Sequence, residues 1–322
     1  MIELRKSKKN QTSKAEQFGV QNISTDSLMK FYTGLTHCSI IYFNAWGDNI
    51  NCLIFWKGSK HASVRYRRRN VMRCKLSSKN QLFLTLICLR LALLHRDLAF
   101  QFGIAESTVS MIISTWVQLL YKRLSALKLV MIPTRETLQQ IIPPCFRPFK
   151  NLKVIVDCFE VFTQMTTNFE QQGNLYSNYK HHCTFKVLIG IALNGAIIFV
   201  SDAYEGAISD KQIFVQSKLA ELLQPGDMVM ADRGFIIRDH LFDHGVTLNM
   251  PPFLKGRKCL TPQEERSAKH IARIRIHVER AIERVRKFKI LQHILPLSQK
   301  RLVSQIVFVV SCLVNYQEPL VH

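Results

Sequence analysis

Two aspartates stand directly after short apolar runs of the kind that form buried strands. Asp157 follows residues 153–156, and Asp232 follows residues 227–231. Functional groups gather at strand ends in open α/β sheets, so neighbouring strands would bring these two carboxylates together. Such a pair is electrostatically costly unless a divalent cation binds it. The positions therefore predict a metal-binding pair, although either acid alone would also serve to cap a turn.

A third acid, Glu279, lies beside the apolar stripe of a helix expected over residues 262–291. It stands 47 residues after Asp232 (279 − 232), and Asp232 stands 75 residues after Asp157 (232 − 157). Residues 266–289 hold nine Lys and Arg against two Glu, a net charge of +7 (9 − 2). An acid among arginines suits a metal ligand flanked by phosphate-binding cations. The alternative is a lattice of ion pairs spaced four residues apart on the helix surface.

Together the three acids predict a nuclease site. Two Asp and one Glu supply hard oxygen ligands of the kind that Mg²⁺ or Mn²⁺ prefers. Two such ions, about 4 Å apart, would activate a water or a DNA 3′-hydroxyl for in-line displacement at phosphorus. Glu160, three residues after Asp157, is an alternative to it as the first ligand.

The elements that must position these acids alternate between strands and helices. Asn194-Gly195 is a strong hairpin signal between two β-rich runs. The resulting order, three strands followed by helix, strand, weaker strand and helix, predicts an α/β layer fold. Besides the two runs that precede the aspartates and the last helix, the expected elements are strands over 184–193, 196–202 and 246–250 and a helix over 211–223.

The preceding segment has the pattern of a helix-turn-helix. Ser77 or Ser78 is a candidate cap for a first helix that buries one face. Ala99 allows close helix packing, and Gly103 tolerates the positive φ of a tight turn. The next helix would lie in the major groove of DNA, although a plain helical bundle shows the same pattern. The first helix would bury Leu82, Leu86, Leu89 and Leu93, and the next would present Ser107, Thr108 and Ser110 at its start.

The charge of the chain points to a polyanion. The 44 Lys and Arg against 23 Asp and Glu leave a net charge of +21. Residues 1–150 carry +16 (23 − 7) and residues 151–322 carry +5 (21 − 16). Basic surfaces bind nucleic acid because each neutralised phosphate releases a counterion. The arginine run at 65–69 is open to three interpretations: a nuclear-import signal, a phosphate contact or a solvated linker.

Other functional classes find little support. The nine cysteines form no Cys-x-x-Cys pair, which argues against a compact zinc module and favours a reducing compartment. The first residues are charged with no apolar run behind them, so no signal peptide is expected. The longest apolar stretches, 187–200 and 306–314, are shorter than the roughly 20 residues of a membrane helix. A soluble protein without a membrane partner is therefore expected.

Several segments resemble the DDE endonuclease domain of Harbinger/PIF-type transposases. They are VIVDCFEVF, YSNYKHHCTFKVLIGIALNGAIIFVSDAYEGAISDK, DMVMADRGF, LNMPPFL and RIRIHVERAIERVRKFKIL. The stretch KLSSKNQLFLTLICLRLALLHRDLAFQFGIAESTVSMI resembles the helix-turn-helix that usually precedes that domain. The resemblance implies a ribonuclease-H-like mixed sheet flanked by helices, preceded by an all-α domain, and metal-dependent DNA cleavage and strand transfer. The family's acids match Asp157, Asp232 and Glu279, and Asp210 in ISDK matches an acid of accessory role.

The sequence therefore predicts an endonuclease of transposon origin that works in the nucleus on double-stranded DNA. A separate DNA-binding partner protein and a homo-oligomer are further expectations. The rival hypothesis is a domesticated DNA-binding protein without cleavage activity; an RNA-processing nuclease lacks an aromatic-rich binding strand to support it. The expected segments are a basic arm over 1–74, a helix-turn-helix over 75–130, a Pro-containing linker over 131–150 and the endonuclease domain over 151–318. The expected DNA contacts are Arg67, Arg68, Arg69, Ser107, Thr108, Lys180, Lys186 and Arg280.

Overall fold

The computed structural model describes residues 18–37, 75–127, 130–140, 151–254 and 256–321, with Pro143, Phe146 and Phe149. The chain divides into two compact units, Met1–Trp116 and Val117–His322. The arginine run at 65–69, with the predicted DNA contacts Arg67, Arg68 and Arg69, lies outside the described residues.

The first unit is helical wherever it is described. The helix α4 (Ser78–Leu91) is buried on all sides from Gln81 to Leu89, so it forms the centre of the unit. The sequence predicted burial of one face only. Leu93 lies beyond α4, because Ala92 takes a left-handed φ of 52° and ends the helix. The elements are η1 (Val20–Asn22), α2 (Asp26–Thr33), α4 (Ser78–Leu91), α5 (His95–Phe102) and α6 (Glu106–Ala126), the last of which continues into the second unit.

Two predicted local features of this unit are confirmed. The Ser77 hydroxyl accepts the backbone N–H of Asn80 and caps α4. Gly103 ends α5 at a φ of +60°, where a side chain would be strained, and α6 begins three residues later. Ala99 is buried, and its carbonyl accepts the N–H of Ile104 across the turn.

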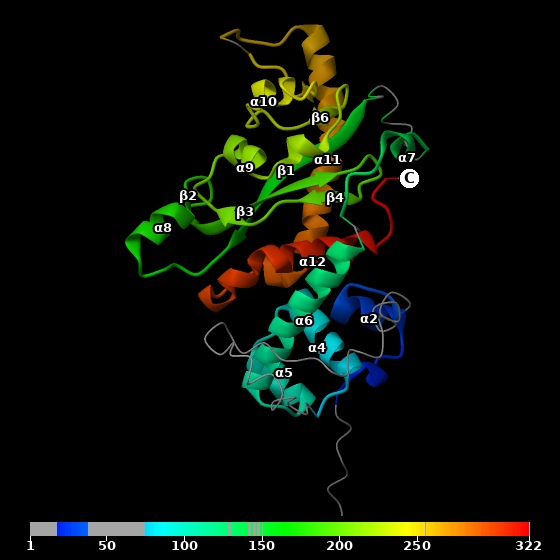
Figure 1. The fold of residues 1–322 in the computed structure, drawn as a ribbon, viewed down its shortest axis with the longest axis vertical. Helices are drawn as coiled ribbons and strands as arrows, with labels where there is room; N and C mark the ends of the chain where they lie inside the picture. Colours follow the sequence, from blue (N-terminus) through cyan, green and yellow to red (C-terminus); the bar gives the residue numbers. More distant parts are fainter. Residues whose placement is uncertain are drawn as a thin grey trace, which may run out of the picture. The chain divides into compact units, whose positions relative to one another are not determined.

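The second unit is built on a mixed seven-stranded sheet (Figure 1). The order along the main path is β2-β3-β1-β6-β7, and β4 and β5 both pair with β3. The central strand β1 is antiparallel to β3 and parallel to β6, and β6 is parallel to β7. The strands are β1 (Leu152–Phe162), β2 (Tyr176–Ser177), β3 (His182–Ile191), β4 (Ile197–Val200), β5 (Tyr204–Glu205), β6 (Met228–Met230) and β7 (Thr247–Asn249).

Helices cover both faces of this sheet. On one face α11 packs on β1 and β3, and α12 packs on β4 and on α11 (Figure 1). On the other face the side chains of α9, η6 and α10 share one core with Val154, Val156 and Val229 of the sheet. The helical elements are α7 (Arg135–Gln140), α8 (Phe169–Leu175), α9 (Asp210–Gln216), η6 (Leu219–Leu222), α10 (Arg238–Phe242), α11 (Pro262–Arg286), η7 (Lys289–Leu291), η8 (Leu297–Leu302) and α12 (Val303–Asn315).

The expected strands and helices are present, but several differ in length from the prediction. The predicted hairpin is confirmed: Gly195 has a φ of +84° and joins β3 to β4. The helix expected over 211–223 is shorter, because Lys218 takes a left-handed φ of 56° and separates α9 from η6. The helix expected over 262–291 ends at Arg286, and the chain continues into the 3-10 turn η7.

Residues 297–315 form a segment that is long and apolar enough to cross a membrane by length and composition alone. Half of it is buried inside the structure. Within it α12 packs on β4, and the Asn315 side chain bonds both the N–H and the carbonyl of Ile197. These contacts are those of a core helix that completes the sheet.

Candidate active site

The strand register places Asp157 and Asp232 side by side. Ile155 of β1 is paired in parallel with Met230 of β6. Two residues further along each strand direction stand Asp157 and Asp232, so both carboxylates emerge where the parallel pairing ends. The neighbouring strands that the sequence analysis required are therefore present.

The sequence predicted that Asp157 stands at the end of its strand, and this prediction is wrong. Asp157 lies inside β1. The strand continues to Phe162 because β3 pairs with it antiparallel from Ile155 to Phe162, and Asp157 is opposite Ile189. Only the parallel half of β1 ends near Asp157. Asp157 is thus held by regular antiparallel pairing with β3, which fixes its direction more firmly than a loop would, whereas its other backbone edge lies beyond the pairing with β6.

Side-chain alternation puts both aspartates on the face that α11 covers. Val156 and Ala231 contribute to the core on the α9 side of the sheet. Their successors Asp157 and Asp232 must point to the opposite face, because neighbouring strand residues alternate. Arg275 of α11 confirms this: its Nη1 is 3.0 Å from Oδ1 of Asp232.

Burial and like charges raise the pKa of Asp157. The largest cause is burial, and the nearby carboxylates of Asp232 and Glu279 raise the pKa further. The backbone N–H of Cys158, which donates to Oδ1 at 2.8 Å, and the Arg275 guanidinium act in the opposite direction. The result is a pKa of about 6. All three predicted acids therefore interact electrostatically at one place.

Glu279 is brought to this place by helix spacing. It follows Arg275 by one turn of α11, so the two side chains occupy the same strip of helix surface. Val278 beside it is fully buried against the sheet, whereas Glu279 itself is exposed. The apolar stripe thus anchors the helix while the acid reaches the open edge of the site.

The donor set suits a hard divalent cation. The three groups are carboxylates, the ligands that Mg²⁺ and Mn²⁺ prefer, and Asp232 and Glu279 add to the effect of burial in raising the pKa of Asp157. Within the described part of the chain, however, no three His, Cys, Asp or Glu side chains stand close enough to hold one ion. Arg275 supplies part of the missing positive charge.

Asp210 belongs to the opposite face of the sheet. Its Oδ1 lies 2.6 Å from Nζ of Lys186, and its Oδ2 lies 2.8 Å from the point where a side chain on Gly234 would begin. Burial alone would lower the pKa of Lys186, but the Asp210 carboxylate outweighs burial and the pKa is raised. Burial, and then Asp210, raise the pKa of the neighbouring Cys158 thiol. The Asp210 carboxylate therefore lies against the loop that follows Asp232, on the α9 side of the sheet.

Of the weaker phosphate candidates, Lys186 is occupied and two others are accessible. Lys186 is largely buried, paired with Asp210, and donates to the carbonyl of Ile208 at 3.3 Å. Arg280 is exposed next to Glu279 on α11. Lys180 is partly exposed, with its Nζ 4.4 Å from the centroid of the Tyr179 ring.

Glu160, the alternative to Asp157, has a structural partner. Its side chain is buried and its Oε2 accepts the Thr184 hydroxyl at 2.7 Å. Three residues separate it from Asp157, so the two side chains point to opposite faces of β1. Glu160 therefore faces away from Asp232 and Glu279.

In the first unit, the predicted DNA contacts on α6 are accessible. Ser107 is exposed and Thr108 is partly exposed in the first turn of the helix, directly after the Gly103 turn. Val109 on the other side of the helix is fully buried. This is the arrangement that lets the second helix of a helix-turn-helix present its N-terminal residues to base edges.

Two family models match this chain. Residues 156–315 match the DDE superfamily endonuclease, and residues 74–126 match the helix-turn-helix of DDE superfamily endonuclease. The chain carries a DDE superfamily endonuclease domain behind its helix-turn-helix. The endonuclease match includes all three candidate acids, and the helix-turn-helix match ends with the last residue of α6.

DDE endonuclease domains generally use divalent metals, which agrees with the carboxylate chemistry of the site. The helix-turn-helix implies DNA binding by the first unit. No curated protein and no solved structure shows a significant match to this chain.

Proposed function

We propose that this protein is a metal-dependent DNA endonuclease and strand-transfer enzyme of the Harbinger/PIF transposase type. One observation carries the proposal: Asp157 and Asp232 emerge side by side on the face covered by α11. There the charges of Asp232 and Glu279 both raise the pKa of Asp157. The match to the DDE superfamily endonuclease over this segment supports it. The mixed sheet with helices on both faces agrees with a ribonuclease-H-like fold.

In this proposal the three carboxylates hold Mg²⁺ or Mn²⁺ at the end of the parallel strand pair. The bound ions supply an activated nucleophile, a water or a DNA 3′-hydroxyl, and positive charge for the leaving oxygen. Asp157 must give up its proton to act as a ligand, since its pKa is about 6. Arg275, which pairs with Asp232, would bind the phosphate of the cut strand when metal occupies the site.

The remaining roles follow from the same proposal. The first unit binds double-stranded DNA at the element ends through α6, with Ser107 and Thr108 at base edges. Arg280 and Lys180 contact the backbone near the site. A transposon-derived enzyme of this kind works in the nucleus, where a DNA-binding partner or a second copy of the chain would add to site selection.

One observation favours a second candidate, a domesticated DNA-binding protein that does not cut. Arg275 already neutralises Asp232, and the described residues bring no three acids within reach of one ion. A protein that only binds DNA would retain this arrangement as a stable ion pair.

The test compares two glutamates of α11. We expect Glu279→Gln to lower metal-dependent nicking of supercoiled DNA carrying the element ends, on the order of 10²- to 10³-fold, because a metal ligand is lost. Its DNA affinity should hold or rise, since a negative charge leaves a basic helix. Glu283→Gln is the matched control, because Glu283 is exposed on the same helix and, among the described residues, forms an ion pair with Lys287 at 3.5 Å and with no other side chain. Wild-type protein that binds these ends yet never nicks them in Mg²⁺ or Mn²⁺ would establish the binding protein instead.

A further inference from the structure

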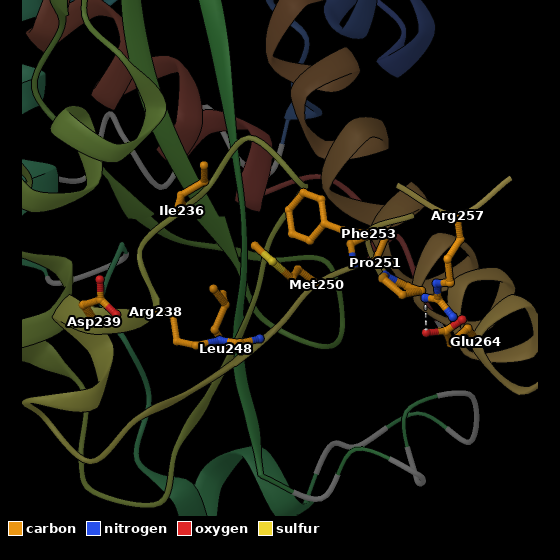
Figure 2. A pocket seen from close by; sticks show the side chains of 10 residues that line it. Ile236, Arg238, Asp239, Leu248, Met250, Pro251, Phe253, Arg257 and Glu264 are labelled. Atoms are coloured by element: carbon orange, nitrogen blue, oxygen red, sulfur yellow. Dashed lines mark hydrogen bonds and ion pairs between the residues drawn. The ribbon is translucent and has the colours of Figure 1, made fainter. Parts of the chain in front are cut away.

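A pocket of about 440 Å³ opens in the second unit beside the segments that follow β6 and β7. Figure 2 shows Met250 between Ile236 and Phe253, with Arg238 and Asp239 at one side and the ion pair of Arg257 and Glu264 at the other. This volume lies within the range of 300–1,000 Å³ that is usual for ligand sites. No function assigned above uses this pocket.

The pocket lies at the same end of the sheet as the candidate carboxylates. Ile236 follows Asp232 by only four residues, in the loop that leaves β6. Met250 directly follows β7, whose last residue Asn249 is paired in parallel with Met230. Residues that follow the ends of the neighbouring strands β6 and β7 therefore line the pocket, and Asp232 also follows the end of β6.

The walls are mostly apolar and partly exposed. The Phe253 side chain is 42% exposed and Ile236 is 67% exposed. Leu248 and Met250 add further apolar lining to the pocket. Exposed aromatic and aliphatic surface at one place marks a binding site more often than chance, and an accessible ring is suited to stacking against a planar group.

Two of the four charged side chains in the pocket are paired with each other, and two are not. Arg257 and Glu264 neutralise each other, since Nη2 and Oε1 are 2.7 Å apart. Arg238 and Asp239 have no ion-pair partner within the described ranges of the chain. A free guanidinium suits a phosphate, and a free carboxylate accepts the N–H groups of a base edge.

We propose that this pocket takes an unstacked nucleobase from the DNA strand that the neighbouring carboxylates cut. Phe253 stacks on the base, Asp239 accepts from its edge, and Arg238 holds the adjoining phosphate. The proposal rests on the proposed function, because it is the DNA bound at Asp232 that places a base within reach. An apolar side chain of a partner protein would fill the walls but leave Arg238 and Asp239 unused.

The test measures the contribution of bases to binding by the full-length protein. Two labelled duplexes carry the same three-nucleotide overhang, one with thymines and one with abasic residues, and both are titrated in EDTA so that they stay uncut. Every phosphate is retained in the abasic duplex, so electrostatic contributions cancel in the ratio of the two dissociation constants. One stacked base is expected to give a ratio between about 5 and 150.

Variants assign that ratio to the pocket. We expect Phe253→Ala to bring the ratio close to one and Phe253→Trp to restore it, because tryptophan keeps a stacking face. Phe242→Ala is the matched control: Phe242 is 80% exposed on the nearby α10 and is not part of the pocket lining. Arg238→Gln should weaken both duplexes alike, whereas Lys258→Gln, at an exposed lysine outside the lining, should change neither.

A ratio of one in the wild-type protein, or an unchanged ratio in Phe253→Ala, overturns the proposal and leaves the pocket to an apolar group of a partner. Nicking measured in parallel separates this result from the enzymatic function. Nicking without a base-dependent ratio removes only the pocket assignment. A Phe253-dependent ratio without nicking in Mg²⁺ or Mn²⁺ confirms the pocket and removes the nuclease.

Discussion

Each face of the sheet holds an aspartate that is paired with a basic side chain, and the two ion pairs differ in exposure and in the number of acids around them. On the α11 face, Asp232 is 3.0 Å from Arg275, its side chain is 50% exposed, and two further acids act at the same place. On the α9 face, Asp210 is 2.6 Å from Lys186, with side chains 29% and 14% exposed. The first group has three acids against Arg275 and an exposed side, whereas the second is a largely buried pair of one acid and one base.

This difference distinguishes a candidate metal site from a structural ion pair. Excess carboxylates cost free energy unless a ligand neutralises them, so the α11 cluster is arranged for a cation that comes from outside. The Asp210 pair needs no external charge, and the Asp210 carboxylate lies so close to Gly234 that a side chain at that position would collide with it. Sequence reasoning treated both aspartates as parts of one catalytic group, with Asp210 as an accessory.

The largest expected effect is on cleavage. Asp232→Asn should reduce metal-dependent nicking on the order of 10²- to 10³-fold or more, while DNA affinity stays close to wild type. Asp157→Asn should behave in the same way, because it loses a ligand at the same place. Nicking of supercoiled DNA and a binding titration, measured on the same preparations, test both expectations.

Asp210→Asn is the matched change on the opposite face. It should keep most of the nicking activity of the folded fraction, since the acid faces away from α11. A loss of cleavage as large as that of Asp232→Asn, in a variant with wild-type thermal stability, would break the comparison and make Asp210 part of the catalytic group.

The next effect is on stability at the closed pair. Lys186→Met should lower the free energy of unfolding by about 2–3 kcal/mol, because the half-buried Asp210 carboxylate loses its only ion-pair partner among the described residues. Urea unfolding gives the value. Added Mn²⁺ should not restore the loss, since the metal is proposed to bind on the α11 face; recovery by Mn²⁺ would place metal at Asp210.

A smaller effect is expected at the open pair. Arg275→Met should lower the free energy of unfolding by about 1 kcal/mol, because Asp232 is half exposed and solvent screens the pair. With the competing guanidinium gone, Mn²⁺ should raise the melting temperature more in this variant than in the wild type. Equal shifts in both proteins would mean that Arg275 does not compete with metal.

The last effect concerns pH. The pKa of Asp157 is raised from 3.8 to about 6, so the folded protein holds this proton where the unfolded chain has released it. The associated stability is full below pH 3.8 and is lost as the pH rises through 6. The metal-free protein should therefore lose stability between about pH 4 and pH 6, and Asp157→Asn should flatten that slope. Mn²⁺ affinity should follow the opposite trend and rise over the same range. Chemical unfolding at each pH, with and without Mn²⁺, separates the two trends.

The sequence by itself determined the elements and their chemistry. Local signals act over a few residues: the Gly103 turn, the Ser77 cap and the Asn194-Gly195 hairpin depend on backbone conformations that each segment prefers by itself. The acidic residue types likewise predicted hard-metal chemistry before any contact was known. The all-round burial of α4 escaped prediction, because periodicity shows which side chains are apolar but not how many neighbours surround a helix.

Only the tertiary structure decided which face each acid occupies. Asp157 and Asp232 share a face because Ile155 and Met230 are paired, and a shift of one residue in that register would turn one carboxylate into the opposite core. The placement of Asp210 behind the sheet and of Arg275 on Asp232 follows from the same register and from the rotation of α11 on β1. Register and helix rotation arise from packing between segments far apart in the sequence, and no local pattern encodes them.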